Sequence, residues 1–303
     1  MTCRPVDAHR ALSPGEIFER YVKTSTPVLL RGAVTNWPAR TRWTPEFFRK
    51  RYPDAAVELV HCATGERIAR RLEDYFTLPR HQKRDWYLCD WNFRQTHREL
   101  LEHIRSPTGF DVDWMSGIPR SERPDLLWIY IGHAGTRGPT HVDNYGTSAW
   151  LAVLQGKKRV RFVDPRGQRT GKLSQLDLFD DDARPEGLRL SEARMSSGDL
   201  LYVPAGCWHA ALNPTYCLSV TANFLDGGCF GPHRDFWMRH WHGEAILAGE
   251  IRRLAGLPQG ADKAQLARHL RRALDQWRET LANESRDATR LATRLGDAER
   301  RKA

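Results

Sequence analysis

Two histidines and one aspartate in the second half of the chain could bind a metal ion. His141 and Asp143 are separated by one residue and follow the turn residues Gly138 and Pro139. Alternate side chains of an extended segment point to the same side, so these two can meet at one ion. His209 offers a third ligand at the end of the segment GDLLYVPAGCWH, where a strand runs into a Pro/Gly turn. Two histidines and one carboxylate form the facial triad of non-haem Fe(II) oxygenases, which leaves coordination positions open.

A lysine further along the chain is suited to bind an anion. In the segment KKRVRF, alternation places Lys158 on the same side as Val160 and Phe162. A cation inside a barrel costs on the order of several kcal/mol unless it is paired. A dicarboxylate bound at the metal would supply that partner. In the alternative interpretation, Lys158 lies near a strand end and extends its charged group into water.

A polar stripe follows His209 by one hairpin. Ser219, Thr221 and Asn223 share one face of a segment whose other face is apolar. The stripe either lines a cavity or faces solvent from a half-exposed strand. Its position directly after the third metal-ligand candidate favours the cavity.

These residues need a β-rich framework, and the sequence between Leu127 and Leu225 predicts one. Five strand-like segments are separated by Gly, Pro and Asp turns: LWIYIG, TSAWLAVL, KRVRFVD, DLLYVP and CLSVTANFL. Closely spaced short strands predict an antiparallel sandwich or barrel rather than a parallel βαβ sheet. The polar stretch from about Gly167 to Ser197 is interpreted as a long connection between strands.

Helical segments flank this β region. On the N-terminal side, Ser13 and Thr44 each precede a proline and predict helix starts, while Pro27 to Leu30 predicts a strand, so this part is expected to be α+β. After Gly228, apolar residues near three- and four-residue spacing predict helices: Ile251, Leu254, Leu266, Leu270, Leu274, Trp277 and Leu281.

The C-terminal segment is basic. Residues 245–303 contain 13 Lys and Arg against 8 Asp and Glu, which is about half of the net charge of +10. A solvated helical surface is the interpretation that we favour. The alternatives are a pair of dimerisation helices or a nucleic-acid-binding surface.

Composition describes an ordinary globular protein. The 303 residues include 40% hydrophobic and 28% charged residues with 11 Trp, which excludes disordered and collagen-like chains. No apolar run is long enough for a membrane span, and no secretory h-region is visible, so a cytoplasmic location is expected. Six cysteines without a CxxC pair predict reduced thiols and disfavour a cysteine-based zinc site.

The order of these motifs resembles the JmjC (cupin-like) Fe(II)/2-oxoglutarate oxygenases. The resemblance is closest to the branch that contains the JmjC lysyl hydroxylase and the asparaginyl hydroxylase of the hypoxia response. It covers roughly residues 27–225. The motifs that carry it are His141-x-Asp143, GTSAW from Gly146 to Trp150, Gly156-x-Lys158, GDLLYVPAGCWH ending at His209, and TANF from Thr221 to Phe224.

The resemblance implies a mainly β fold with flanking helices, built on a double-stranded β-helix of the jelly-roll or cupin type. It implies that iron is bound by His141, Asp143 and His209, and that Lys158 binds the distal carboxylate of 2-oxoglutarate. Thr221 and Asn223 match positions that line the cosubstrate pocket. Tyr87, in the segment DWYLCD, stands where the asparaginyl hydroxylase has a tyrosine that helps the lysine to bind the distal carboxylate of 2-oxoglutarate.

The chain departs from the family pattern at two positions. Gly138 lies three residues before His141, where related hydroxylases have a threonine that contacts the cosubstrate. Thr136 or Thr140 could replace that threonine. Leu151 stands where the lysyl hydroxylase has an asparagine.

The resulting hypothesis is an enzyme that uses Fe(II), O₂ and 2-oxoglutarate to hydroxylate a C–H bond. A side chain in a protein or peptide is the expected substrate. The alternatives are a free amino acid, a natural-product intermediate, an RNA base, an N-methyl group lost by demethylation, or a metal-binding cupin without oxidative activity. We expect an oxygenase domain over residues 1–228, a helical region over residues 229–303 that could form a homodimer, and no membrane partner.

Overall fold

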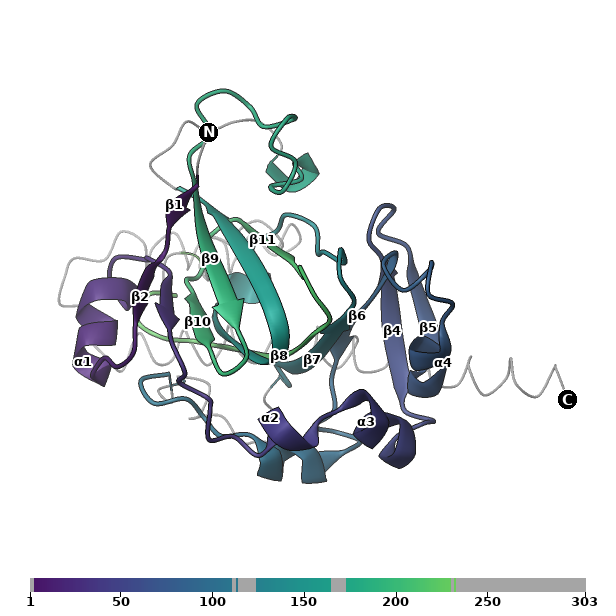
Figure 1. Ribbon diagram of the computed structural model, residues 1–303. Coiled ribbons are helices and arrows are strands. Elements are labelled where there is room, and N and C mark those ends of the chain that lie inside the picture. Colours follow the sequence, from purple (N-terminus) through teal and green to yellow (C-terminus); the bar gives the residue numbers. More distant parts are fainter. Residues whose placement is uncertain (1–2, 111–112, 114–123, 165–172, 230–231, 233–303) are drawn as a thin grey trace, which may run out of the picture.

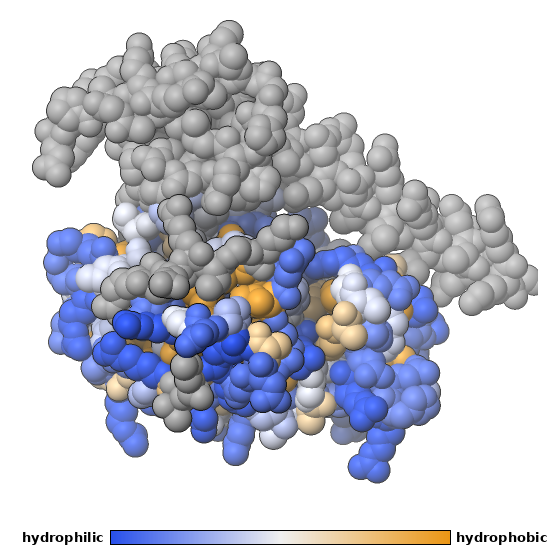
Figure 2. All heavy atoms as spheres, turned by 90° about the horizontal axis from the view of Figure 1, so that it is seen from above, coloured by the Kyte–Doolittle hydropathy of each residue, from blue (hydrophilic) through white to orange (hydrophobic). Residues whose placement is uncertain are grey.

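The computed structural model of the chain describes residues 3–110, 113, 124–164, 173–229 and 232. Figure 1 shows a mainly β structure with short helices at its margins. The face seen in Figure 2 is largely hydrophilic, with an apolar area near its centre. The predicted C-terminal helices, including the apolar positions from Ile251 to Leu281, lie outside the described residues.

One long strand, β8 (Ser148–Val163), connects the two halves of the β structure. Its first half pairs with β10 (Leu200–Val203) and β12 (Cys217–Phe224), and its second half pairs with β9 (Leu190–Ser196) and β11 (His209–Leu212). The sequence predicted two separate strands here. Gly156 instead continues the strand with a φ of 75°, and an added Cβ would overlap the carbonyl of Tyr216, so only glycine fits this bend.

Strand β9 corrects the interpretation of residues 167–197 as a connection. Ala193 and Met195 point inward and are buried, opposite Val160 and Lys158 of β8. The outward Glu192 is also buried because it pairs with arginines. The polar composition concealed a strand on whose outward face Glu192 is buried among ion pairs, while Arg194 and Ser196 on the same face are exposed.

The remaining strands extend the sheet on both sides of β8. The hydrogen-bonded order runs β2 (Asp7–His9), β3 (Val28–Leu30), β10, β8, β12, β7 (Leu127–Gly132), β6 (Trp86–Trp91), β4 (Ala56–His61) and β5 (Arg67–Arg71). β1 (Arg4–Pro5) pairs with β9. Most neighbours are antiparallel, while the β2–β3 and β1–β9 pairs are parallel.

Short helices follow the predicted start signals. Ser13 forms a capping box with Glu16 at α1 (Pro14–Ile17), which continues as a π-helical turn over Phe18–Val22. Thr44 accepts a hydrogen bond from the backbone of Phe47 at α3 (Pro45–Arg51). The others are α2 (Ala39–Arg42), α4 (Leu72–Thr77) and the 3₁₀ turns Arg98–His103, Asn144–Gly146 and Leu173–Gln175.

Two of the apolar clusters among the described residues pack against the strands around β8. The larger one packs the helices against one face of β6, β7, β8 and β12, with members such as Trp43, Phe48, Tyr75, Ile129 and Val220. The second joins residues from both halves of β8 with residues of β9 and β10, and it includes Val153, Val160, Phe162, Met195 and Leu201. The inner face of β8 is therefore largely dry, which is the environment that a buried lysine would have to tolerate.

The prediction of reduced thiols is confirmed, because all six cysteines are free. In the part of the chain that the structure describes, no helix is long and apolar enough to cross a membrane.

Candidate metal centre

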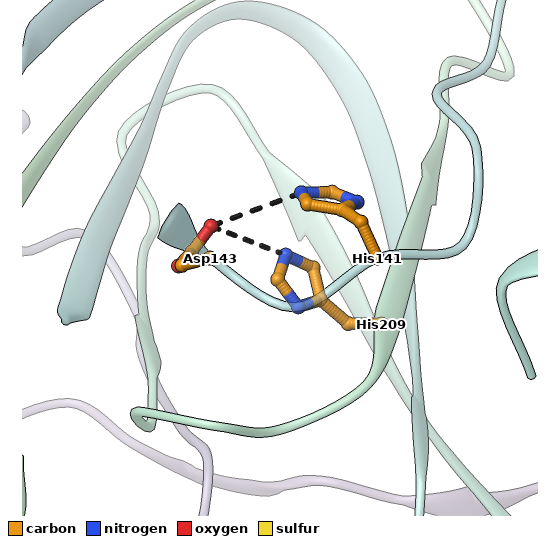
Figure 3. Close-up of side chains that lie close together, drawn as sticks. All are labelled: His141, Asp143 and His209. Atoms are coloured by element: carbon orange, nitrogen blue, oxygen red, sulfur yellow. Dashed lines mark ion pairs between the residues drawn. The ribbon is translucent and has the colours of Figure 1, made fainter. Parts of the chain in front are cut away.

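The three predicted metal ligands lie together at one end of the β structure. One ligand atom from each of His141, Asp143 and His209 lies within 4.8 Å of the others. The Nε2 atoms of His141 and His209 are 3.7 and 3.9 Å from Oδ1 of Asp143, and Figure 3 shows all three side chains pointing toward one another.

Backbone pairing explains why the two imidazoles are neighbours. His141 and His209 form an antiparallel bridge in which each backbone N–H donates to the other residue's carbonyl, at 2.9 and 2.8 Å. Directly opposed residues of such a pair carry side chains on the same face. The ring centroids are accordingly 4.3 Å apart. Asp143 follows in the extended segment and returns its carboxylate to the same side.

Hydrogen bonds determine which nitrogen of each histidine faces the centre. Nδ1 of His141 lies 2.9 Å from the carbonyl of Pro139, and Nδ1 of His209 lies 2.9 Å from the carbonyl of Cys207. A carbonyl only accepts, so each Nδ1 carries the hydrogen and each Nε2 keeps its lone pair for a metal. Oδ2 of Asp143 is buried and has no hydrogen-bond partner among the described residues.

The electrostatics also suit a cation. Burial lowers the pKa of His209 to about 4, with a further contribution from His141 that the Asp143 carboxylate partly offsets. His209 is therefore neutral at neutral pH, as a metal ligand must be. The donor set of two imidazole nitrogens and one carboxylate fits a divalent iron ion. The side chain of His141 is 46% exposed, so the centre is open to solvent on one side.

Lys158 points into the interior as the alternation predicts. Its side chain is buried, and its Nζ donates a hydrogen bond of 2.8 Å to the hydroxyl of Tyr87 on β6. The alternative in which Lys158 extends to water is wrong, because the residue is only 2% exposed. Burial lowers the pKa of Lys158, and no carboxylate in the described ranges lies within ion-pair distance of it.

Thr221 and Asn223 are half-buried on β12 and are tethered to neighbouring segments. Oγ1 of Thr221 donates to the carbonyl of Trp150 at 2.8 Å, and Nδ2 of Asn223 donates to Oγ1 of Thr147 at 2.9 Å. The structure does not bring either side chain into hydrogen-bond contact with Lys158 or Tyr87.

The structure distinguishes the two threonines that the sequence left open. Oγ1 of Thr140 donates to the carbonyl of Leu176, in the segment before β9. Thr136 is fully buried, and its Oγ1 lies 2.9 Å from Nδ2 of Asn213, which in turn interacts with Tyr87. Sequence reasoning missed Asn213, because a single amide four residues after His209 carries no periodic signal.

A separate cavity of about 490 Å³ lies on the outward side of β9. Its lining includes Arg159, Arg161, Arg194 and Glu192 but none of the three metal-ligand candidates. Glu192 pairs with all three arginines, so one carboxylate is shared among three positive charges at the border of this cavity.

Comparison with known proteins places the chain in a family. A model of the cupin-like domain matches residues 14–226. The chain belongs to the cupin-like domain family. All three metal-ligand candidates, Lys158 and Tyr87 lie inside the matched cupin-like segment, in agreement with the resemblance to JmjC proteins.

Named relatives of this cupin-like chain include oxygenases and demethylases. It is 27% identical over 232 residues to the bifunctional arginine demethylase and lysyl-hydroxylase psr-1 of Caenorhabditis elegans, covering 69% of this chain and 58% of that protein. It is 23% identical over 262 residues to the 2-oxoglutarate and iron-dependent oxygenase JMJD4 of Mus musculus, covering 73% and 60%. It is 27% identical over 245 residues to the lysine-specific demethylase JMJ21 of Arabidopsis thaliana, covering 75% and 26%. The chain thus spans between about a quarter and three fifths of the length of these relatives.

Proposed function

We propose that this chain is an oxygenase that depends on Fe(II) and 2-oxoglutarate and hydroxylates a C–H bond in an amino-acid side chain of a protein or peptide. Two observations carry the proposal. The ring of His209, a member of the facial triad, lies 5.8 Å from that of Phe162 on β8, and Lys158 is buried on the same face of that strand with no acidic partner in the described ranges. The triad suits iron, and the lysine suits the distal carboxylate of 2-oxoglutarate. The names of JMJD4 and psr-1, which refer to such cofactors and to hydroxylation, support it.

The residues of the site have distinct tasks in this proposal. Bound Fe(II), 2-oxoglutarate and O₂ supply the oxidising chemistry. His141, Asp143 and His209 would hold the metal from one side and leave the other side open. Lys158 would bind the distal carboxylate, and the dry interior around it would strengthen that interaction and exclude water.

Demethylation is the second candidate, and it uses the same chemistry. Psr-1 and JMJ21 are both named as demethylases of basic residues. Oxygen insertion into a C–H bond of an N-methyl group forms a hemiaminal, which breaks its C–N bond and releases formaldehyde. A carbon that is not bound to nitrogen would keep the hydroxyl group. The position of the target carbon therefore decides between the two outcomes.

We infer two further features of organisation. The strand pairing around β8 supports a double-stranded β-helix over an oxygenase unit of residues 1–228. The apolar spacing from Ile251 to Leu281 supports a helical region of residues 229–303 that pairs two copies of the chain. Light scattering of the full chain tests the second point, and a monomer at micromolar concentration would refute it.

An anaerobic titration tests the proposed function. Purified protein with Fe(II) and 2-oxoglutarate should develop a weak visible metal-to-ligand charge-transfer band, which the His141→Ala and Lys158→Ala variants lose at the same ligand concentrations. Peptides that contain lysine, arginine or methylated arginine are then incubated with the aerobic enzyme. Mass spectrometry should show the gain of one oxygen atom or the loss of a methyl group. Metal binding without the band and without affinity for 2-oxoglutarate would indicate a non-oxidative cupin instead.

A further inference from the structure

A buried polar network surrounds the Tyr87 hydroxyl group. Asn213, at the end of β11, and Thr136, in the turn after β7, are both buried beside it. Their backbones are also joined, because the N–H of Asn213 donates to the carbonyl of Thr136 at 2.9 Å and its carbonyl accepts from Gly135 at 2.8 Å. The amide of Asn213 is thus held in place by main-chain contacts on both sides.

Thr136 determines which way the Asn213 amide is turned. Oγ1 of Thr136 donates its single proton to the carbonyl of His133 at 2.7 Å. It must therefore accept a hydrogen bond from its other neighbour, so the NH₂ group of Asn213 faces it at 2.9 Å. The second N–H of that group is left for the Tyr87 hydroxyl. Burial raises the pKa of Tyr87 well above its ordinary value, and the hydrogen bond from Asn213 opposes this increase.

The groups beside the Tyr87 oxygen are hydrogen-bond donors, so they offer no acceptor for the hydroxyl proton of Tyr87. The Tyr87 hydroxyl oxygen accepts from Nζ of Lys158 and interacts with the amide of Asn213. A phenolic oxygen that accepts from the Lys158 ammonium group and has an amide NH₂ group beside it directs its O–H elsewhere. Within the described part of the chain, Tyr87 donates no hydrogen bond to an acceptor side chain or carbonyl. Its O–H and the remaining N–H groups of Lys158 are therefore available to one anion.

The main chain at Gly132 lies close to the side chains of Asn213, Thr136 and Tyr87, and this close approach makes the arrangement possible. A Cβ at Gly132 would lie 2.3 Å from Nδ2 of Asn213, 2.3 Å from Oγ1 of Thr136 and 2.9 Å from the ring of Tyr87. The three polar side chains can meet only because residue 132 has no side chain.

We propose that Asn213 is a positioning residue for the anion pocket: its amide, oriented by Thr136, keeps the Tyr87 proton directed at the distal carboxylate that Lys158 binds. This inference rests on the proposed function, since that carboxylate belongs to 2-oxoglutarate. It assigns Asn213 and Thr136 no contact with the metal or with the substrate.

Affinity measurements on two 2-oxo acids test the proposal. The Fe(II)-loaded full chain is titrated anaerobically with 2-oxoglutarate and with 2-oxovalerate, which has the same chain length but no distal carboxylate. Asn213→Ala should weaken 2-oxoglutarate binding about tenfold or more, the size expected for one hydrogen bond to a charged group. Its effect on 2-oxovalerate binding should stay below about twofold. Asn36→Ala, at an exposed asparagine, is the matched control.

A second set of variants separates positioning from folding. In a Tyr87→Phe background, Asn213→Ala should change 2-oxoglutarate affinity less than about twofold, because the group that it orients is gone. Thr136→Val should weaken 2-oxoglutarate binding in the same direction, while Thr136→Ser, which keeps the hydroxyl, should not. The threonine pair tests the proposal even if Asn213→Ala does not fold.

The outcomes separate this inference from the proposed function. Equal loss of affinity for both 2-oxo acids, or an undiminished loss in the Tyr87→Phe background, would show a merely structural role and overturn the inference. Wild-type protein that binds 2-oxoglutarate in a Lys158-dependent way, with unchanged affinity in Asn213→Ala and Thr136→Val, would overturn the inference alone. Wild-type protein that binds no 2-oxoglutarate would overturn both.

Discussion

Nζ of Lys158 donates a hydrogen bond of 2.8 Å to the hydroxyl of Tyr87, and both side chains are buried. The partner is a neutral phenol, so the lysine charge has no counter-ion in the described part of the chain. A buried, unpaired cation destabilises a fold, whereas an arriving anion turns the same charge into a strong binding group. Binding and stability should therefore respond in opposite directions when Lys158 is changed.

Lys158→Met removes the charge and retains most of the side-chain volume. We expect 2-oxoglutarate affinity to fall by about 100-fold or more, since truncating one member of a buried charge pair costs about 2–5 kcal/mol. The ligand-free variant should be more stable than wild type by about 1 kcal/mol or more. Calorimetric titration and urea unfolding measure the two effects. Lys157→Met, at the exposed neighbour, is the control, and a large loss of stability in Lys158→Met would reveal an internal counter-ion.

Removing a metal ligand should abolish iron binding at ordinary concentrations. We expect His141→Ala and Asp143→Ala each to weaken Fe(II) affinity by more than about 100-fold, because loss of an outer-shell partner alone costs about 10–100-fold. Anaerobic calorimetry with Fe(II) is the measurement. His61→Ala, which alters a histidine outside the triad, should bind iron as wild type does. Retained affinity in Asp143→Ala would place the carboxylate outside the coordination shell.

Two glycines near the site should respond differently to the same substitution. Gly132→Ala places a methyl group against Asn213, Thr136 and Tyr87, while Gly138→Ala meets nothing within 4 Å. We expect Gly132→Ala to lower the free energy of unfolding by about 1–3 kcal/mol, as overpacking does, and to weaken 2-oxoglutarate binding. Gly138→Ala should change neither property. Equal behaviour of the two variants in urea unfolding would contradict the close approach at Gly132.

The ion pairs that Glu192 of β9 forms with three arginines should make the free energy of unfolding sensitive to acid. Burial acts to raise the pKa of Glu192, but hydrogen bonds from Arg159, Arg161 and Arg194 outweigh it and lower the pKa from 4.5 to about 2. Because the folded-state pKa is the lower one, this stabilisation is complete above about pH 4.5 and is lost as the pH falls toward 2. The difference corresponds to about 3 kcal/mol.

Glu192→Gln tests this expectation through urea unfolding at a series of pH values. The variant should lose about 3 kcal/mol or more at neutral pH, because it removes the carboxylate that Arg159, Arg161 and Arg194 share and leaves buried Arg161 paired with exposed Asp181 alone. Its stability should also depend less on pH between 4.5 and 2. Glu186→Gln, at an exposed glutamate, should retain the wild-type profile. A wild-type acid profile in Glu192→Gln would assign the dependence to other carboxylates.

Local patterns in the sequence predicted the directions of several side chains. Alternation placed His141 and Asp143 on one side and Lys158 inward, and the structure agrees with both. The helix starts at Ser13 and Thr44 followed from their capping side chains. These features depend on residues within one strand or one turn, where backbone geometry fixes which side chains share a face.

The sequence did not reveal strand β9 or the continuity of β8, because burial by ion pairs and a bend at Gly156 have no apolar signature. It also left Thr136 and Thr140 equivalent and gave no indication of Asn213. Tyr87, Thr136 and Asn213 come from segments on either side of β7 and from the end of β11. Their meeting depends on strand register and on the turn after Gly132. Residue types along the chain thus determined what the site can bind. Only the tertiary structure decided which polar groups meet around Tyr87, because contacts between distant segments are set by packing rather than by local periodicity.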